Sequence, residues 1–147
     1  MVSRQNNIYS LEELKKLASG IAKTLEGGEV IALFGDLGSG KTTFTQFLAK
    51  ALGVKRRVPS PTFVVMRAYD DLNLRDVSLH HYDFYRLDSL EEIRDLGVEE
   101  DFKDPKTICV IEWAKKAKEL LPEKRIEIYF ETVEQGKRKI EVKGHRL

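Results

Sequence analysis

Two uninterrupted apolar runs, residues 30–34 and 107–111, predict the centre of this protein's fold. Strands with one solvated face alternate apolar and polar side chains, whereas continuous apolar runs are typical of strands that are covered on both faces of a parallel sheet. We therefore expect both runs to be central strands of a sheet with helices packed against it.

Apolar residues at helical spacing predict helices beside these strands. The first stripe begins at a capping-box pattern starting at Ser10 and extends to Leu25, before a Gly-Gly pair. A second stripe follows the first apolar run and stops at Gly53, which is suited to end a helix. Two further helices are expected at residues 89–97 and 113–121.

Shorter segments rich in β-branched and aromatic residues predict additional strands at residues 62–69 and 79–87. The short loop between them favours a hairpin, so the sheet should be mixed. Residues 126–130 and 140–142 alternate apolar and polar positions and predict a C-terminal antiparallel hairpin. The expected fold class is α/β, with one domain over residues 1–147, a mixed central sheet flanked by helices and this hairpin.

Composition narrows the class of protein. The chain has 147 residues, of which 41% are hydrophobic, and its 25 Lys and Arg against 24 Asp and Glu leave a net charge of +1. No overall electrostatic field therefore favours binding to nucleic acid, to a membrane surface or to an acidic partner. The single cysteine, Cys109, excludes a disulfide framework and a cysteine-based zinc site. Without a signal-peptide pattern or an apolar run long enough to span a membrane, we expect a soluble cytoplasmic protein.

Residues 35–42 read Gly-Asp-Leu-Gly-Ser-Gly-Lys-Thr, which is the complete P-loop (Walker A) pattern between a predicted buried strand and a predicted helix. Glycines let successive backbone N–H groups converge on phosphates, and the helix N-terminus adds its dipole. Lys41 would reach the β- and γ-phosphates of ATP, and Thr42 would bind Mg²⁺. The expected nucleotide contacts here are Asp36, Leu37, Gly38, Ser39, Gly40, Lys41, Thr42 and Thr43.

Two carboxylates are candidates for the catalytic chemistry that a P-loop alone lacks. Glu112 follows the second apolar run, at the strand end where open α/β sheets hold ligands, and fits a Walker B residue that binds Mg²⁺ directly or through water. Asp83 lies among aromatic residues and could orient the attacking water or join the outer magnesium shell. The alternatives are a simple exposed acid for Glu112 and an arginine-paired acid for Asp83.

Three other segments have both a functional and a structural interpretation. Thr62, after Ser60-Pro61, could sense the γ-phosphate or only begin a turn. His80 and His81 point to opposite faces of a strand, so packing or hydrogen bonding is favoured over a metal pair. The basic residues 55–57 could contact RNA, but a solvated loop is favoured.

The P-loop, Ser60-Pro61-Thr62-Phe63, the His-rich segment 80–86 and Ile111-Glu112-Trp113 together closely resemble the TsaE family. This is the P-loop ATPase family of bacterial tRNA threonylcarbamoyladenosine biosynthesis. The resemblance implies a weak Mg²⁺-dependent ATPase that works with the TsaB and TsaD proteins, which modify an adenosine of tRNA. It also implies Mg²⁺ ligation by Thr42 and Glu112, a role for Asp83 in hydrolysis, and adenine contacts from Ser10, Leu11 and Arg138.

Two other classes of function remain as competing interpretations. A small-molecule kinase could use Asp83 as the base that accepts a proton from a hydroxyl substrate, with Arg86 holding phosphate. No arginine-rich lid or second acceptor segment supports it. A guanine-nucleotide switch is disfavoured because Asp-x-x-Gly and Asn-Lys-x-Asp segments are missing after the P-loop.

Overall fold

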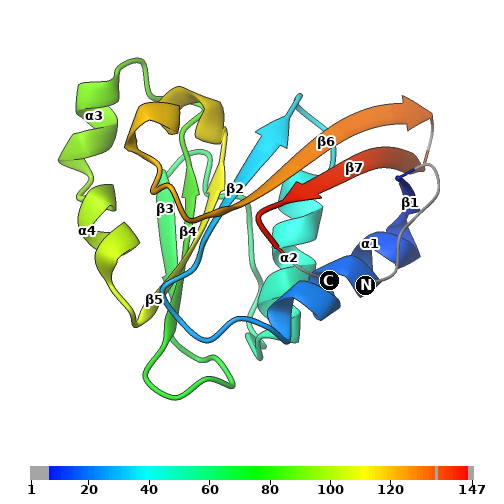
Figure 1. The fold of residues 1–147 in the computed structure, drawn as a ribbon, viewed down its shortest axis with the longest axis horizontal. Helices are drawn as coiled ribbons and strands as arrows, with labels where there is room; N and C mark the ends of the chain where they lie inside the picture. Colours follow the sequence, from blue (N-terminus) through cyan, green and yellow to red (C-terminus); the bar gives the residue numbers. More distant parts are fainter. Residues whose placement is uncertain (1–6, 135, 146–147) are drawn as a thin grey trace.

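Strand β2 (Val30–Gly35) lies at the middle of a seven-stranded mixed sheet whose strand order is β1-β7-β6-β2-β5-β4-β3 (Figure 1). A computed structural model describes residues 7–134 and 136–145. β2 pairs in parallel with both neighbours, β5 and β6, and β5 pairs in parallel with β4. The outer pairs β3–β4, β6–β7 and β1–β7 are antiparallel, so the predicted mixed α/β sheet is confirmed.

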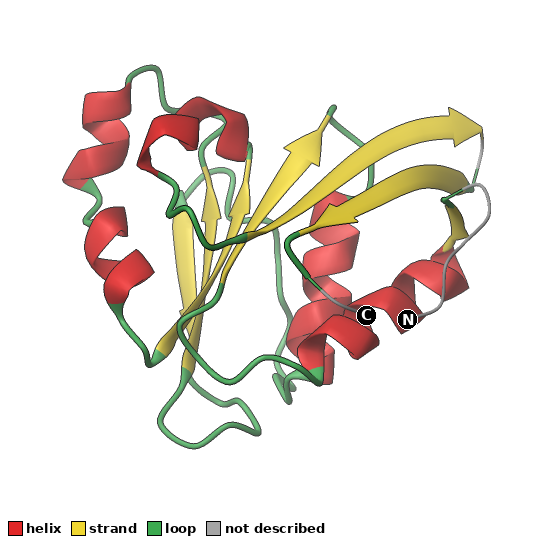
Figure 2. Cartoon of the chain, viewed as in Figure 1, coloured by secondary structure: helices red, strands yellow, loops and turns green. Residues whose placement is uncertain are grey.

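The helices form a layer on each side of this sheet (Figure 2). Helices α1 and α2 pack on one face, and α3, α4 and the 3-10 helix η1 pack on the other. No helix in the described ranges is long and apolar enough to cross a membrane. The remaining elements are β1 (Ile8–Ser10), α1 (Leu11–Ala22), α2 (Lys41–Ala51), β3 (Met66–Tyr69), β4 (Ser78–Asp83), α3 (Leu90–Asp95), α4 (Val98–Lys103), β5 (Thr107–Glu112), η1 (Ala114–Leu120), β6 (Ile126–Glu134) and β7 (Lys137–Lys143).

The two continuous apolar runs are central strands, as predicted, because both of their faces are buried. In β2, Ile31 and Leu33 pack toward α1 and α2, while Val30 and Ala32 pack toward the other helical layer. Strand β5 alternates in the same way, and all six of its residues are buried. The observed β2–β5 register places Leu33 opposite Glu112 and so defines the position of the residues that follow the two strands.

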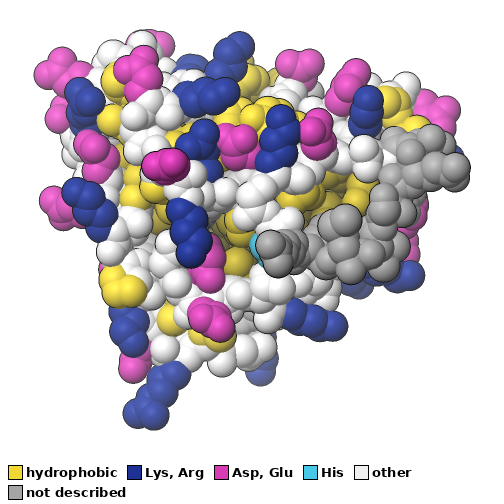
Figure 3. All heavy atoms as spheres, viewed as in Figure 1, with side chains coloured by type: hydrophobic (Ala, Val, Ile, Leu, Met, Phe, Trp, Pro, Cys, Tyr) yellow, Lys and Arg dark blue, Asp and Glu magenta, His cyan; other side chains and the backbone are white. Residues whose placement is uncertain are grey.

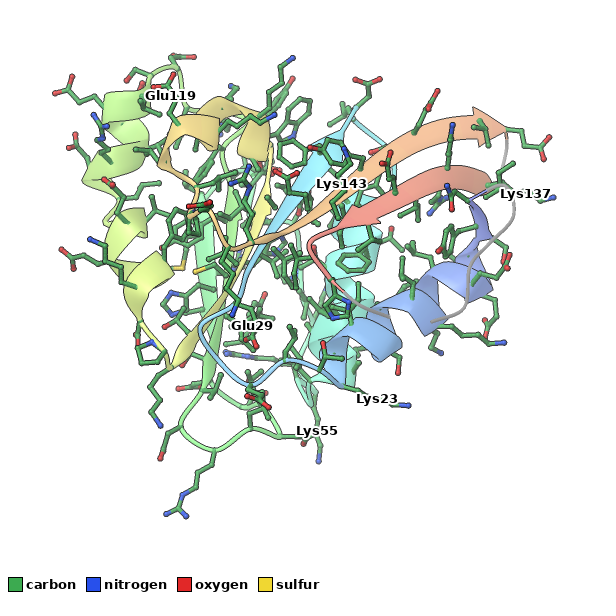
Figure 4. All side chains as sticks on the ribbon, in the orientation of Figure 1. Lys23, Glu29, Lys55, Glu119, Lys137 and Lys143 are labelled. Carbon is green, nitrogen blue, oxygen red and sulfur yellow. The ribbon has the colours of Figure 1, made fainter. Side chains whose placement is uncertain are left out.

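The first and last strands are neighbours. β6 and β7 form the predicted C-terminal hairpin, with a register shift between Thr132 and Glu134, and labelled Lys137 and Lys143 mark the two ends of β7 (Figure 4). β1, which the hydrophobic pattern does not predict, adds to the free side of β7 and leads directly into α1. Ser10 caps α1 in a complete capping box with Glu13, so this predicted helix start is confirmed.

Two predicted strands are shorter in the structure than in the sequence pattern. β3 begins only at Met66, because the backbone N–H groups of Val64 and Val65 both donate to the carbonyl of Pro61 and close a turn over residues 62–65. Val65 has a left-handed backbone, with φ of 71°. β4 ends at Asp83, whose carboxylate accepts the Tyr85 backbone N–H and turns the chain.

Three helical predictions are corrected in their bounds or type. α1 ends at Ala22, before Leu25, because the next bonds are tighter turn bonds such as Thr24 N–H to the Ile21 carbonyl. The segment expected at 113–121 is the 3-10 helix η1, broken by non-helical geometry at Ala117. The segment expected at 89–97 is α3, and α4, which follows it, was not predicted.

Candidate functional site

A glycine-rich loop joins the carboxyl end of β2 to the start of α2. Gly40 occupies the N-cap position of α2 with a left-handed backbone, φ of 110°, and a Cβ there would lie 3.0 Å from Nη1 of Arg138. In the part of the chain that the structure describes, no side chain caps α2, whose first residue is Lys41. The N-terminal end of the helix dipole therefore faces this loop, which is the arrangement that favours a bound anion.

Beside this loop lies a pocket of about 260 Å³. Its walls come from segments that are distant in sequence: the loop and α2, the turn at residues 60–62, the ends of β4 and β5, and strand β7. This is the edge of the sheet at the carboxyl ends of β2, β4 and β5, where open α/β sheets hold their ligands. The lining residues are Leu37, Gly38, Gly40, Lys41, Thr42, Thr43, Ser60, Thr62, Asp83, Tyr85, Glu112, Trp113 and Arg138.

Lys41 supplies a buried cation to the pocket, since the residue is only 4% exposed. Its Nζ donates hydrogen bonds to the backbone carbonyls of Gly35 and Asp36 and lies 4.3 Å from the centre of the Trp113 ring. Desolvation lowers the pKa of Lys41, and the charges of nearby carboxylates, Glu112 first, oppose that shift. A phosphate in the pocket would offer this ammonium a stronger acceptor than the two carbonyls.

Glu112 ends β5 and is 3% exposed. Its Oε1 accepts a hydrogen bond of 2.8 Å from the Thr42 hydroxyl, and its Oε2 lies 2.6 Å from Nε2 of His81. The hydroxyl and the carboxylate come from the start of α2 and the end of β5, which the β2–β5 pairing brings together. Glu112 is therefore not the exposed strand-end acid that we considered as the alternative.

Asp83 lies beside Glu112 in the β4–β5 register and is 2% exposed. Its Oδ2 accepts a 2.6 Å hydrogen bond from the Thr62 hydroxyl, and its Oδ1 accepts the Tyr85 backbone N–H at 2.9 Å. The Ser60 hydroxyl lies 2.8 Å from that of Thr62 and extends this chain of polar groups. Within residues 7–134 and 136–145, no ion pair joins Asp83 to an arginine.

Comparison with known proteins identifies the family. The model of the family described as "Threonylcarbamoyl adenosine biosynthesis protein TsaE" matches residues 8–140. This chain belongs to the TsaE family. The resemblance that the four motifs carry is therefore confirmed over most of the chain.

Several curated relatives share the name "tRNA threonylcarbamoyladenosine biosynthesis protein TsaE". The Bacillus subtilis (strain 168) protein is 40% identical over 129 residues, which are 88% of this chain and 78% of that protein. The Treponema pallidum (strain Nichols) protein is 35% identical over 133 residues, covering 90% and 95%. The crystal structure of Bacillus subtilis YdiB matches with a TM-score of 0.70 at 33% identity, covering 90% of this chain and 78% of that one.

The oxygen donors in this TsaE family member suit a magnesium ion accompanied by phosphates. Mg²⁺ prefers hard oxygen ligands and is bound in nucleotide sites by one or two protein groups together with phosphate oxygens and water. The Thr42 hydroxyl and the Glu112 carboxylate supply two such groups at the pocket. The described residues include no cluster of three His, Cys, Asp or Glu side chains that would form an all-protein metal site.

The structure brings most of the predicted site residues of this TsaE family member to one pocket, but not all of them. Asp36 contributes its carbonyl to Lys41, and Ser39 is buried within the loop. Ser10 and Leu11 are absent from the pocket lining; Ser10 caps α1, and Leu11 is 52% exposed. The predicted lining residues are Leu37, Gly38, Gly40, Lys41, Thr42, Thr43, Asp83, Glu112 and Arg138.

Two aromatic residues, Tyr85 and Trp113, also line the pocket, and the sequence pattern predicts no individual role for either. Their ring centres are 4.9 Å apart, and Trp113 has a left-handed backbone with φ of 59°. The signal that could have found Trp113 is its place immediately after Glu112, at the carboxyl end of a buried strand. His81 was expected to pack or hydrogen bond, and its contact with Glu112 confirms that expectation.

Proposed function

We propose that this TsaE family protein binds ATP with Mg²⁺ in the pocket, hydrolyses it slowly, and uses its nucleotide state to control docking to the TsaB and TsaD proteins. The observation that carries the proposal is the 2.8 Å hydrogen bond between the Thr42 hydroxyl and the Glu112 carboxylate, beside the buried Lys41. A nucleotide site needs a cation for phosphate and oxygen ligands for Mg²⁺ within reach of one loop. These three side chains meet that requirement.

Each residue of the loop has a defined part in this proposal. The backbone N–H groups of Asp36 to Thr43 would surround the phosphates at the N-terminus of α2. Lys41 would exchange its carbonyl partners for the β- and γ-phosphates, and Thr43 would contact the α-phosphate. Thr42 and Glu112 would hold Mg²⁺, whose chemistry is to neutralise charge on the phosphate oxygens.

Asp83 is proposed to support hydrolysis by orienting the attacking water. Its carboxylate faces the pocket and is held by Thr62 and by the Tyr85 backbone, so its position is defined before nucleotide enters. Among the described residues, Asp83 and Glu112 are the carboxylates that line the pocket. So small a set of catalytic groups is in keeping with a slow accessory ATPase.

The base of ATP is proposed to lie toward Arg138, with Ser10 and Leu11 as outer contacts. Arg138 lines the pocket and approaches Gly40, and its strand neighbour across the β1–β7 pair is Tyr9, directly before Ser10. An arginine guanidinium can stack on a planar base as well as meet phosphate. The side of the pocket next to β1 and β7 is therefore where we place adenine.

Docking is proposed to respond to nucleotide through the turn at residues 62–65. Thr62 joins this turn to Asp83 inside the pocket, while Phe63 at its tip is 83% exposed. A partner that contacts such a turn would sense which nucleotide is bound, because the two states differ in their contacts. Lys, Arg, Asp and Glu intermingle over the face seen in Figure 3, and the net charge of the whole chain is only +1. We propose that tRNA is reached indirectly, through TsaB and TsaD in the cytoplasm.

Mg²⁺-dependent ATP hydrolysis by the purified protein, alone and with the TsaB–TsaD pair, tests the proposal, with Lys41→Ala as the blank. We expect slow turnover that rises when the pair is added. A turnover rate that does not change when the TsaB–TsaD pair is added would contradict the docking proposal. The small-molecule kinase would then be the leading alternative, to be tested with hydroxyl acceptors. No binding of ATP at all would overturn the proposal as a whole.

A further inference from the structure

We propose that His81 is a positioning residue that holds Glu112 in the orientation needed for magnesium binding. The inference rests on the proposed function, because it assigns a role toward the Mg²⁺ that Thr42 and Glu112 would hold. His81 is fully buried in β4, and its Nε2 lies 2.6 Å from Oε2 of Glu112. It does not line the pocket, so it acts only through the carboxylate.

The β4–β5 register explains why this histidine reaches Glu112. The two strands are parallel, with His81 opposite Val110 and Asp83 opposite Glu112. The imidazole therefore reaches diagonally across the sheet, from β4 to the β5 residue that lies two positions beyond Val110. His80, the preceding residue, points to the other face and lies 2.6 Å from Asp101 of α4. The two adjacent histidines thus make comparable contacts with different carboxylates.

The surroundings of the ring define its hydrogen-bonding form. Nδ1 of His81 is buried and has no partner among the described residues. A proton on Nδ1 would leave a buried donor unsatisfied, which is costly, whereas a proton on Nε2 is donated to the Glu112 carboxylate. The geometry therefore assigns the tautomer with the proton on Nε2.

The two oxygens of Glu112 have different roles in this arrangement. Oε1 faces Thr42 at the pocket, where a bound cation would compete for both groups. Oε2 is bonded to His81, which is fully buried and does not line the pocket. The His81 bond is thus the contact that keeps Glu112 oriented when Thr42 changes partner. Outer hydrogen bonds of this kind commonly contribute about 10- to 100-fold to metal affinity or activity.

Three variants separate positioning from a general packing role. His81→Leu removes the donor, and His81→Gln can return an amide N–H to the place of Nε2. His80→Leu is the matched control, because it removes a contact of the same length on the opposite face of the same strand. Circular dichroism and thermal unfolding of all three establish which variants are folded.

The first readout is the Mg²⁺ concentration for half-maximal ATP hydrolysis, alongside ATP affinity in the presence of a chelator. For His81→Leu we expect an increase of about tenfold or more in the Mg²⁺ requirement, with Mg²⁺-free ATP affinity within about twofold of the unchanged protein. His81→Gln should return the Mg²⁺ requirement most of the way to that of the unchanged protein, and His80→Leu should have the same Mg²⁺ requirement as the unchanged protein. An unaltered Mg²⁺ requirement in folded His81→Leu, or an equal increase in His80→Leu, would overturn the proposal.

The second readout needs neither nucleotide nor a folded His81→Leu variant. Long-range ¹H–¹⁵N correlation of the ¹⁵N-labelled protein reports the tautomer of each of its three histidines, with His81→Gln assigning the signal. A proton on Nε2 of His81 is expected, and a proton on Nδ1 would overturn the assignment. If the tautomer is as expected but the unchanged protein binds no ATP, the proposed function fails, not the geometry.

Discussion

The ammonium of Lys41 lies 4.3 Å from the centre of the Trp113 indole ring, on the side of the pocket formed by the glycine-rich loop. In this position the cation interacts with the ring face while its hydrogen bonds go to the carbonyls of Gly35 and Asp36. Any phosphate that draws Lys41 away from these partners must also change the surroundings of Trp113.

Trp113 should therefore report nucleotide binding directly. It is the only tryptophan of the chain, so its fluorescence can be measured without interference from another indole. We expect ATP to change its emission in a saturable titration, and Lys41→Ala to abolish the change at the same concentrations. An equal change in Lys41→Ala would show that the signal does not come from displacement of the cation.

Lys41→Met should separate affinity from stability. We expect ATP affinity to fall about 100-fold or more, since charge-assisted bonds to phosphate contribute about 1.5–3 kcal/mol each. The nucleotide-free variant should be at least as resistant to urea as the unchanged protein at neutral pH, because burial of the ammonium disfavours its charged form. A clear loss of stability would contradict this account of Lys41.

The lowered pKa of Lys41 also predicts how the free energy of unfolding changes with pH. The pKa of Lys41 is lower in the folded protein than the ordinary value of 10.5, so the unfolded chain binds more protons in the window between them. The contribution of Lys41 to stability must then rise as pH increases through the folded pKa toward 10.5. We expect urea unfolding across this pH window to show that the unchanged protein gains free energy of unfolding relative to Lys41→Met. Parallel plots of this free energy against pH for the two proteins would refute the pKa shift.

Glu112→Ala should remove Mg²⁺-dependent turnover and spare much of the ATP binding, because the loop and Lys41 remain. Turnover and ATP affinity, each measured with Mg²⁺ and with a chelator, distinguish the two effects. Glu119→Ala is a suitable control, since this acid lies in η1 outside the pocket lining. Unchanged hydrolysis in Glu112→Ala would eliminate its assignment as a magnesium ligand.

The hydrogen bond from Thr62 to Asp83 should contribute to the free energy of unfolding, and the Asp83 carboxylate that it holds should contribute to ATP turnover. Thr62→Val leaves one oxygen of the buried Asp83 without its donor, so we expect a loss of about 1–3 kcal/mol in the free energy of unfolding. Asp83→Asn should reduce stimulated ATP turnover at least about tenfold. A double-mutant cycle measures the coupling between the two residues. Additive effects on stability would mean that the 2.6 Å contact contributes nothing.

Patterns that depend on burial along one element were readable from the sequence. β2 and β5 are continuous apolar runs because helices cover both faces, and the positions of Lys41 and Glu112 follow from the ends of these strands. The capping box at Ser10 was readable because its two residues, Ser10 and Glu13, are close in sequence. For these features the determining interactions are either close in sequence or repeated along a strand.

Features set by tertiary contacts were not readable in this way. Residues 62–65 have the composition of a strand, but the N–H groups of Val64 and Val65 bond the Pro61 carbonyl instead of a neighbouring strand. β1 has only three residues and exists because β7 offers an edge. Alternation predicts that His81 faces one side of β4, yet it cannot show that Glu112, 31 positions away, is the partner.

The strand order of the sheet also has a consequence for biosynthesis. β2 carries the glycine-rich loop, but both of its neighbours, β5 and β6, are translated much later, and Glu112 follows Thr42 by 70 positions. While the ribosome has delivered only the N-terminal half, β2 has no partner strand, and the Thr42 hydroxyl and the Glu112 carboxylate cannot meet. A nascent chain must therefore pass through most of its synthesis without this site, during which the exposed apolar β2 is a segment for chaperones to protect.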